Sequence, residues 1–363
     1  MASANSASAR KQSSSPVPLS YVGTEDEAKV GSVNADTELA DTSTTSGGSA
    51  LGDDASIASS TVTVEESVYS YTTLYGRTYQ VSPATEYWGP NDETQSDGLD
   101  LAHEFITMLL GDRLFEAPIV EPPQAILDVG TGTGLWAINV ADRFPETHII
   151  GTDISAIQPC WVPPNCFFQI DDVQLDWTFG PSRFDLVHIR SLGGSVADWR
   201  RLYQQAYRSL QPGGWIEHFE FTTRLYSRVP HIRDDPDHIF HRWADTFNEA
   251  GERMGKTLRI GVKGVMRSML RRVGYVSIIE KTRRVPVGGW GSDARDRDIG
   301  IYNLAFMVVS LEGFALFMLH SIMGWDYERV QVFVAEMRGA IMDTNLQPYY
   351  YVRNVYARKP TAP

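Results

Sequence analysis

The chain has 363 residues, of which 42% are hydrophobic and 11% aromatic, enough to build a sizeable core. Its formal net charge is −13, and this acidic balance disfavours the phosphate backbone of nucleic acid as a partner. Cys160 and Cys166 are the only cysteines, with no histidine close by in the sequence. The sequence therefore predicts neither a disulfide framework nor a metal site.

Residues 1–65 are rich in Ser, Thr and acidic residues and contain hardly an aromatic side chain. Such a segment buries too little apolar surface to fold, so we predict a disordered tail. It has no apolar stretch typical of a secretory signal, and Arg10-Lys11 is too short for a nuclear-import cluster. We expect a cytoplasmic protein, with a nuclear location as the alternative. Aromatic residues then become frequent, and residues 66–363 are predicted to fold.

An apolar pattern at helical spacing begins at Leu99, in LDLAHEFITMLL. Five short apolar runs follow, and amphipathic segments that are typical of helices separate several of them. The predicted strands are QAILDV (124–129), HIIGTDIS (148–155), CFFQIDD (166–172), FDLVHI (184–189) and WIEHFEF (215–221). Apolar strands alternating with helices predict an α/β fold with a doubly wound, mostly parallel sheet, and we assign its core to residues 99–222.

Residues 223–363 are less regular. A helix is predicted over 237–254, a strand over 275–285, helices over 301–342 and a final strand over 349–357. Helices inserted between the two closing strands predict a cap over the ligand edge of the sheet.

The long apolar run from Phe306 to Trp325 is interrupted by Glu312 and His320. We interpret it as a buried helix pair divided at Gly313 and Gly324, not as a membrane span.

The most informative segment is a glycine-rich turn between a predicted strand and a predicted helix. Gly130, Gly132 and Gly134 allow a tight turn and close approach of a ligand to the backbone. Nicotinamide oxidoreductases use such a turn too, but their fingerprint requires a small residue where this chain has Leu135. Asp128 would also repel a pyrophosphate. S-adenosylmethionine has no phosphate and carries two cationic groups, so the acidic turn favours it as the cofactor.

Acidic residues follow the next two predicted strands. Asp153, followed by Ile154, is placed to accept hydrogen bonds from both hydroxyls of a ribose. Asp171 and Asp172 follow the third strand, where a carboxylate can accept from an adenine amino group while Val173 packs on the ring. Three acids at successive strand ends indicate a nucleoside site.

Several separated blocks resemble the fungal LaeA-like methyltransferases of the class I superfamily. They include ILDVGTGTGLWAINVADRFP, IIGTDISAIQPCWVPPN, SLGGSVADWRRLYQQAYRSLQPGGWIE and YYYVRNVYARKP, in this order. The resemblance implies a seven-stranded sheet whose last strand is antiparallel, and a role in secondary metabolism. It also implies that Asp128, Gly130, Gly132 and Gly134 contact the donor's amino-acid end, Asp153 the ribose, and Asp171, Asp172 and Val173 the adenine. Where relatives usually have Asp-Arg-Leu-Asp, residues 97–100 are Asp-Gly-Leu-Asp, which puts the substrate and the activity in doubt.

Candidate catalytic residues lie near the ends of the fourth and fifth strands. Methyl transfer is an in-line displacement, and a base is needed only when the acceptor must lose a proton. His188, Arg190, His218 and Glu220 are candidates, and His103 on the entry helix is another. The alternative for the two strand histidines is a structural role in the apolar core.

We therefore predict an S-adenosylmethionine-dependent methyltransferase that acts on an oxygen or nitrogen of a small secondary-metabolite acceptor, without a nucleic-acid or membrane partner. The alternative implied by the resemblance and the acidic tail is a nuclear regulator of secondary metabolism that acts through protein partners.

Overall fold

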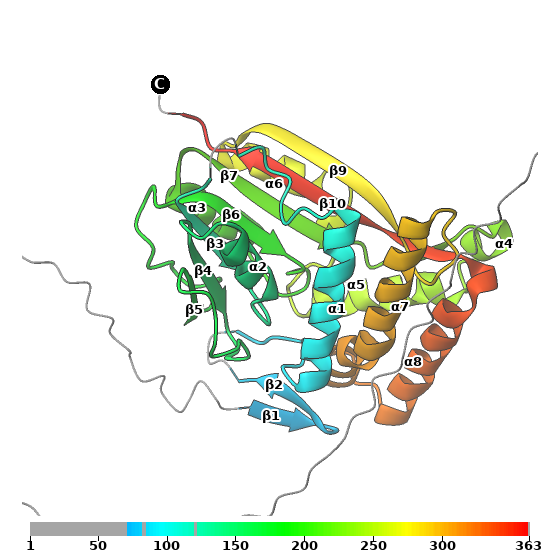
Figure 1. The fold of residues 1–363 in the computed structure, drawn as a ribbon. Helices are drawn as coiled ribbons and strands as arrows, with labels where there is room; N and C mark the ends of the chain where they lie inside the picture. The colour runs from blue at the N-terminus through cyan, green and yellow to red at the C-terminus, as the bar shows by residue number, and fades with distance from the viewer. Residues whose placement is uncertain (1–70, 82–84, 120–121, 362–363) are drawn as a thin grey trace, which may run out of the picture. The chain divides into compact units, whose positions relative to one another are not determined.

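The computed structural model describes residues 71–81, 85–119 and 122–361 (Figure 1). The chain divides between Thr61 and Val62 into two units, and every described residue belongs to the second. The predicted tail lies outside the described residues.

The second unit contains an eight-stranded sheet in the order β5-β4-β3-β6-β7-β10-β8, with β9 paired to β10. The parallel strands are β5 (Cys166–Ile170), β4 (His148–Asp153), β3 (Ala125–Val129), β6 (Phe184–Arg190) and β7 (Leu210–Phe221). One strand, β10 (Pro348–Arg358), runs antiparallel to them; β8 (Tyr226–Ser227) and β9 (Val276–Pro286) pair antiparallel with β10 and therefore run in the same direction as β7. Apart from the two-residue β8, this is the predicted seven-stranded, mostly parallel sheet. The prediction of a class I methyltransferase fold is confirmed.

Helices cover both faces of the sheet. Side chains on one strand alternate between the two faces, so neighbouring residues of a strand pack against different helices. On β3, Ile126 packs in the apolar cluster of α2 (Leu135–Arg143), whereas Leu127 packs in that of α3 (Trp199–Ser209) and α6 (Val265–Val273). Both residues are fully buried. The strands therefore carry the continuous apolar runs that the sequence displays.

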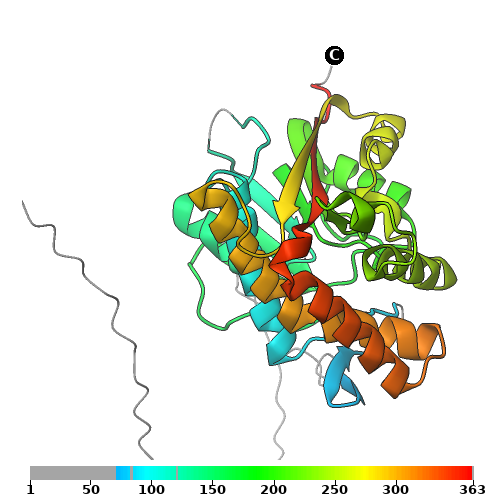
Figure 2. The same ribbon diagram turned by 90° about the vertical axis from the view of Figure 1, so that its right-hand side faces the viewer.

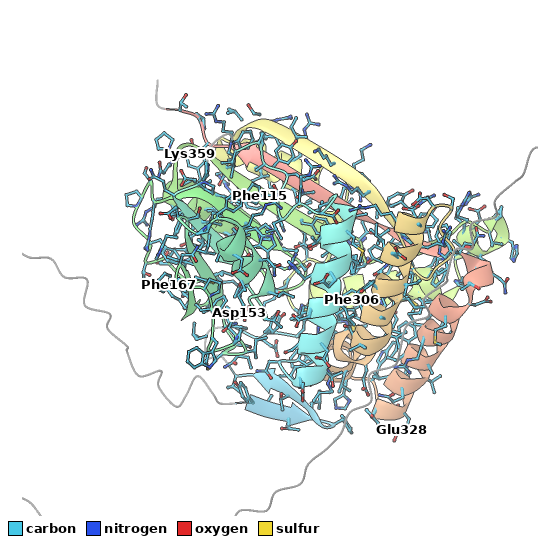
Figure 3. All side chains as sticks on the ribbon, viewed as in Figure 1. Phe115, Asp153, Phe167, Phe306, Glu328 and Lys359 are labelled. Atoms are coloured by element: carbon cyan, nitrogen blue, oxygen red, sulfur yellow. The ribbon has the colours of Figure 1, made fainter. Side chains whose placement is uncertain are left out.

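A third apolar cluster lies beside the carboxyl ends of the strands. It joins α1 (Glu93–Leu109), α5 (Ile239–Arg253), α7 (Ala294–Ala315) and α8 (Tyr327–Met342). The helices α1 and α7 lie side by side (Figures 1 and 2). Phe306 on α7 (Figure 3) contacts Phe105 on α1, and the ring centroids are 5.7 Å apart. The predicted helical cap between the two closing strands is thus present.

The expectation of two helices divided at Gly313 is wrong. The segment continues from α7 into η3 (Leu316–Ile322), a π-helical stretch, and the chain turns only at Gly324, where φ is +73°. Gly313 instead lets α1 approach, because a Cβ there would lie 2.7 Å from the Gln95 side-chain oxygen. The helix Ala294–Ile322 is long and apolar enough to cross a membrane, but half of its apolar window is buried here.

Several elements were not predicted. They are the hairpin β1 (Tyr71–Leu74) and β2 (Arg77–Gln80), the helix α4 (Pro230–Arg233), the helix α6, and the short turns η2 (Arg259–Gly261) and η4 (Thr344–Leu346). Arg77 holds the hairpin to α1 through two hydrogen bonds of 2.6 and 2.9 Å to Asp92. Asp92 also caps α1 by accepting from the Gln95 amide, as N-cap carboxylates do.

Candidate functional site

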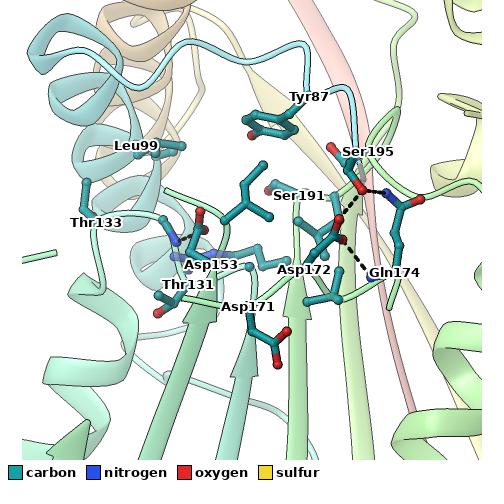
Figure 4. Close-up of a pocket in the computed structure, with 18 of the residues that line it drawn as sticks. Tyr87, Leu99, Thr131, Thr133, Asp153, Asp171, Asp172, Gln174, Ser191 and Ser195 are labelled. Carbon is teal, nitrogen blue, oxygen red and sulfur yellow. Dashed lines mark hydrogen bonds between the residues drawn. The ribbon is translucent and has the colours of Figure 1, made fainter. Parts of the chain in front are cut away.

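A pocket of about 900 Å³ opens at the carboxyl ends of β3, β4, β5 and β6 (Figure 4). We call it the edge pocket. Residues that follow the four strands form its base and sides, and α1 and the segment 85–87 complete it. Its lining comprises Thr85, Tyr87, Leu99, Ala102, Ile106, Gly130, Thr131, Gly132, Thr133, Leu135, Asp153, Ile154, Asp171, Asp172, Val173, Gln174, Arg190, Ser191, Leu192 and Ser195. In an open parallel sheet, this edge is where ligands bind.

The glycine-rich turn forms part of the pocket wall through two of its three glycines. Gly130 and Gly132 line the pocket with φ angles of +71° and +60°, a region that favours glycine. Gly134, with φ of +80°, does not line the pocket. It precedes α2 and lies against the ring of Phe168 on β5. This glycine therefore serves the packing of a strand against a helix, and its predicted contact with the ligand stays a prediction.

Backbone amides of the turn are already engaged inside the protein. The amides of Gly130 and Thr131 both donate to the Thr152 carbonyl at 2.8 Å. The Gly132 amide donates to Asp153 at 2.8 Å. A pyrophosphate binds where such amides point at the ligand. The turn is therefore poorly suited to a dinucleotide and fits a ligand without phosphate.

Asp153 lies at the end of β4 and faces the pocket (Figures 3 and 4). One carboxylate oxygen accepts from Gly132 and the other from the Ser155 amide at 3.0 Å. Each oxygen has a second lone pair with which it can accept from a ligand hydroxyl. Burial raises the pKa of Asp153 to about 6, so the group is a carboxylate at neutral pH.

The residues after β5 form the next part of the wall. Asp171, Asp172 and Val173 all line the pocket, as does Ile154 after β4. Asp172 is fixed in place, since it accepts from the Thr85 hydroxyl and from the Gln174 amide. The structure thus brings together seven of the nine residues predicted for the cofactor.

Asp128 is the second predicted cofactor residue, after Gly134, that does not line the edge pocket. It is buried beneath the turn, with one oxygen 2.7 Å from His188 Nδ1 and the other 2.7 Å from the Thr131 hydroxyl. The imidazole of His188 stacks on Trp136 at a centroid distance of 3.7 Å. Neither Asp128 nor His188 lines the edge pocket. In this structure the pair supports the turn from below, and the predicted contacts of Asp128 with the donor and of His188 with the substrate stay predictions.

Of the two candidate catalytic residues on β7, His218 is buried beneath the site and Glu220 lines a pocket. His218 is fully buried, with Nδ1 2.7 Å from the Tyr203 hydroxyl and Nε2 2.9 Å from Glu220 Oε1. It lines neither the edge pocket nor the second pocket described below; its contacts support Glu220, and its predicted contact with substrate stays a prediction. Glu220 lines a second pocket, and Arg190 on β6 lines the edge pocket.

The second pocket, which we call the aromatic pocket, has a volume of about 1160 Å³. It lies next to the edge pocket, because Tyr87, Leu99, Ala102 and Ser191 line both. Most of its wall is apolar or aromatic. The lining comprises Tyr87, Trp88, Gly89, Gln95, Leu99, Ala102, Ser191, Gly193, Glu220, Phe221, Thr222, Thr223, Leu225, Trp243, Phe247, Leu258, Phe306, Met307, Leu311, Phe314 and Tyr350. Of these residues, Glu220 alone has an ionisable carboxyl or basic side chain.

Tyr87 is a site residue that the sequence argument did not identify. Its ring lies over the edge pocket, across from Asp153 (Figure 4). Burial, with the nearby charge of Asp153, raises the pKa of Tyr87. The segment is anchored on both sides of Tyr87, by Thr85 to Asp172 and by the Lys256 ammonium to the Glu86 carbonyl. The aromatic cluster before α1 was the only signal, and it gave no position in space.

The chain matches known methyltransferases. A family model described as a methyltransferase domain matches residues 102–258. Methyltransferase pytC of Aspergillus terreus is 34% identical over 83% of this chain and 92% of its own. Secondary metabolism regulator LAE1 of Cochliobolus heterostrophus is 33% identical over 78% of this chain and 94% of its own. A solved structure of Haemonchus contortus phosphoethanolamine N-methyltransferase 2 with S-adenosyl-L-methionine covers 73% of this chain and 52% of that one, with 15% identity and a TM-score of 0.42.

The family model and the two curated relatives decide between the cofactors considered from the sequence. The prediction of S-adenosylmethionine is confirmed, and the nicotinamide alternative is wrong. With a relative above 30% identity that spans most of both chains, this protein belongs to the LaeA-like family of S-adenosylmethionine-dependent class I methyltransferases.

Proposed function

We propose that this protein transfers a methyl group to an oxygen or nitrogen of a small, uncharged aromatic acceptor bound in the aromatic pocket. The observation that carries the proposal is the junction of the two pockets, where Tyr87, Leu99, Ala102 and Ser191 line both. A donor in one pocket and an acceptor in the other would meet at this junction.

The residues of the edge pocket fit the donor. Gly130 and Gly132 leave room for close approach to the turn, and Asp153 can accept from ribose hydroxyls. Asp171, Asp172 and Val173 would surround the adenine. The Ser195 hydroxyl, buried in the wall, has no hydrogen-bond partner among the described residues and can bond to the ligand. When bound, S-adenosylmethionine supplies an electrophilic methyl group on a sulfonium.

Glu220 is our candidate for the base. Its Oε1 accepts from the Leu192 amide at 2.8 Å and from His218 Nε2 at 2.9 Å. Its Oε2 has no hydrogen bond within the described part of the chain and lies near Gly193, another residue of the pocket wall. Oε2 is therefore the oxygen that can take the proton which an acceptor hydroxyl or amine loses as it gains the methyl group.

Tyr203 and His218 orient the Glu220 carboxylate through a chain of two hydrogen bonds. Burial raises the pKa of the Tyr203 hydroxyl well above its usual value, so the hydroxyl keeps its proton and donates to His218 Nδ1. The imidazole then has its own proton on Nε2, which it donates to Glu220. These contacts fix the orientation of the carboxylate, and they act on the reaction only through Glu220.

The wall of the aromatic pocket supports our choice of an uncharged aromatic acceptor. Eight of its residues are aromatic: Tyr87, Trp88, Phe221, Trp243, Phe247, Phe306, Phe314 and Tyr350. Flat aromatic ligands pack well against such rings. Among the described residues, no Lys or Arg lines this pocket, so a phosphate or carboxylate would be buried beside Glu220 without a counter-ion. A phenol, an indole or a neutral amine has no negative charge, so it is not repelled by Glu220 and needs no counter-ion.

The test is product formation from the full chain with S-adenosylmethionine and a panel of phenols, indoles and aromatic amines, followed by mass spectrometry. Each accepted compound gains one methyl group, and its phosphorylated counterpart does not react. Glu220→Gln lowers turnover by about 10²-fold or more and leaves donor affinity unchanged. Glu104→Gln, on the exposed face of α1, is the matched control. Preferential methylation of anionic compounds would refute the acceptor class.

The relative named as a secondary metabolism regulator supports a second proposal, a regulatory role through a protein partner in the nucleus. The Glu220→Gln chain separates the two. If the chain regulates without catalysis, this variant restores metabolite production in a strain that lacks the gene, and the tagged chain enters the nucleus. Loss of production with the variant favours the enzyme.

A further inference from the structure

The charged residues of the edge pocket are arranged unevenly. Asp153 ends β4, and Asp171 and Asp172 follow β5, so all three carboxylates lie on one side of β3 in the strand order. Arg190 ends β6, on the other side of β3. Among the residues that line this pocket, Arg190 is the only Lys or Arg. The pocket therefore has an acidic end and a single cation at the opposite end.

Arg190 has no ion pair within the described ranges. Its Nη1 and Nη2 lie 3.5 and 3.4 Å from His103 Nδ1. The nearby Asp128 carboxylate is already occupied by His188 and Thr131. Burial lowers the pKa of Arg190, which reflects the cost of desolvating a charge without a close counter-ion. A ligand anion would remove this cost.

His103 contacts the Arg190 guanidinium without neutralising its positive charge. It lies buried on α1, 3% exposed, and burial together with the charge of Arg190 lowers the pKa of His103 to about 3. The ring is therefore neutral at pH 7, and its Nδ1 keeps a lone pair that accepts from the guanidinium. The full positive charge of Arg190 stays available to a ligand.

We infer that Arg190 binds the carboxylate at the methionine end of the donor, and that His103 is the positioning residue for the guanidinium. The inference rests on the edge pocket being the donor site. A guanidinium can grip a carboxylate with two parallel hydrogen bonds. With Asp153 holding the ribose on one side of the glycine turn and Arg190 the carboxylate on the other, the donor lies across β3 in one direction only.

Binding measurements on two related ligands test this assignment directly. S-adenosylhomocysteine has the amino-acid end, whereas 5′-methylthioadenosine has the same nucleoside and sulfur without it. In calorimetric titrations of the full chain, Arg190→Gln weakens S-adenosylhomocysteine about tenfold or more and leaves 5′-methylthioadenosine within about twofold of the wild type. Arg272→Gln, on the exposed face of α6, changes neither affinity. Retained 5′-methylthioadenosine binding also shows that the variant is folded.

The His103 variants extend the test. His103→Leu weakens S-adenosylhomocysteine selectively, and His103→Gln, whose side-chain oxygen can still accept, restores part of the loss. Equal weakening of both ligands by Arg190→Gln would overturn the inference, as would no effect on either, while the donor site itself would stand. If the wild-type chain bound neither ligand, the donor site and the inference would both fail.

Discussion

The third glycine of the turn gives a prediction about stability and not about ligand binding. Gly134 has a φ of +80°, and an alanine Cβ there would overlap the ring of Phe168, with Cε1 2.8 Å away. A left-handed conformation costs a residue with a Cβ about 1–2 kcal/mol. Overpacking against the ring adds about 1–3 kcal/mol. We therefore expect Gly134→Ala to lower the free energy of unfolding by roughly 2–5 kcal/mol.

Urea unfolding of the full chain, followed by tryptophan fluorescence, measures this loss. The two contributions separate in a Phe168→Ala background, where the overlap is gone and only the backbone strain remains. There Gly134→Ala costs about 1–2 kcal/mol. A loss below about 1 kcal/mol in the wild-type background would refute the conformational argument. An equal loss in both backgrounds would refute the contact with Phe168.

Three further predictions concern other residues. Gly132→Ala carries similar backbone strain but lies in the edge pocket, so S-adenosylhomocysteine binding weakens, measured by titration. Because burial raises the pKa of Asp153 to about 6, this carboxylate is protonated as the pH falls below 6. Affinity for S-adenosylhomocysteine is therefore level above pH 7, drops towards pH 5, and shows no such drop in Asp153→Asn. Against the effect of burial, hydrogen bonds from Arg283, Asn354 and Lys281 lower the pKa of Glu116 from 4.5 to about 2. Its stabilisation is complete above pH 4.5 and is lost as the pH falls towards 2. Glu116→Gln therefore destabilises the fold by about 3–5 kcal/mol at pH 7 in urea unfolding, and by less below pH 4.5.

The sequence was sufficient for the sheet, because each apolar run between helical segments can be covered only in a doubly wound arrangement. It was also sufficient for the acidic residues that end strands. Asp153 and Asp171 lie at the carboxyl edge wherever the sheet forms, since parallel strands end on the same side. For these residues the position along the chain already determined the position in space.

The sequence did not show how far below the carboxyl edge of the sheet each candidate side chain lies. His188 lies two residues before Arg190 on the same face of β6, and His218 lies two residues before Glu220 on β7. Two strand residues correspond to about 6–7 Å, which separates a side chain in the pocket wall from one buried beneath it. Asp128 is buried for the same reason. Sequence spacing predicted the correct strands, but not where the pocket floor lies.

The segment before α1 was beyond prediction for a different reason. Tyr87 lines both pockets only because its neighbours are anchored to residues far along the chain, Thr85 to Asp172 and Glu86 to Lys256. Contacts between such distant residues leave no periodic pattern in the sequence. The aromatic cluster indicated that folding begins there, not that it lies over the edge pocket.

The most direct test of the account is a calorimetric titration of the full chain with S-adenosylhomocysteine, repeated on Asp153→Ala and with NADH as the control ligand. We predict that the wild-type chain binds S-adenosylhomocysteine, that Asp153→Ala binds it at least about tenfold more weakly, and that NADH does not bind. Binding of NADH, or equal affinity of the variant and the wild type for S-adenosylhomocysteine, would contradict the assignment of the edge pocket.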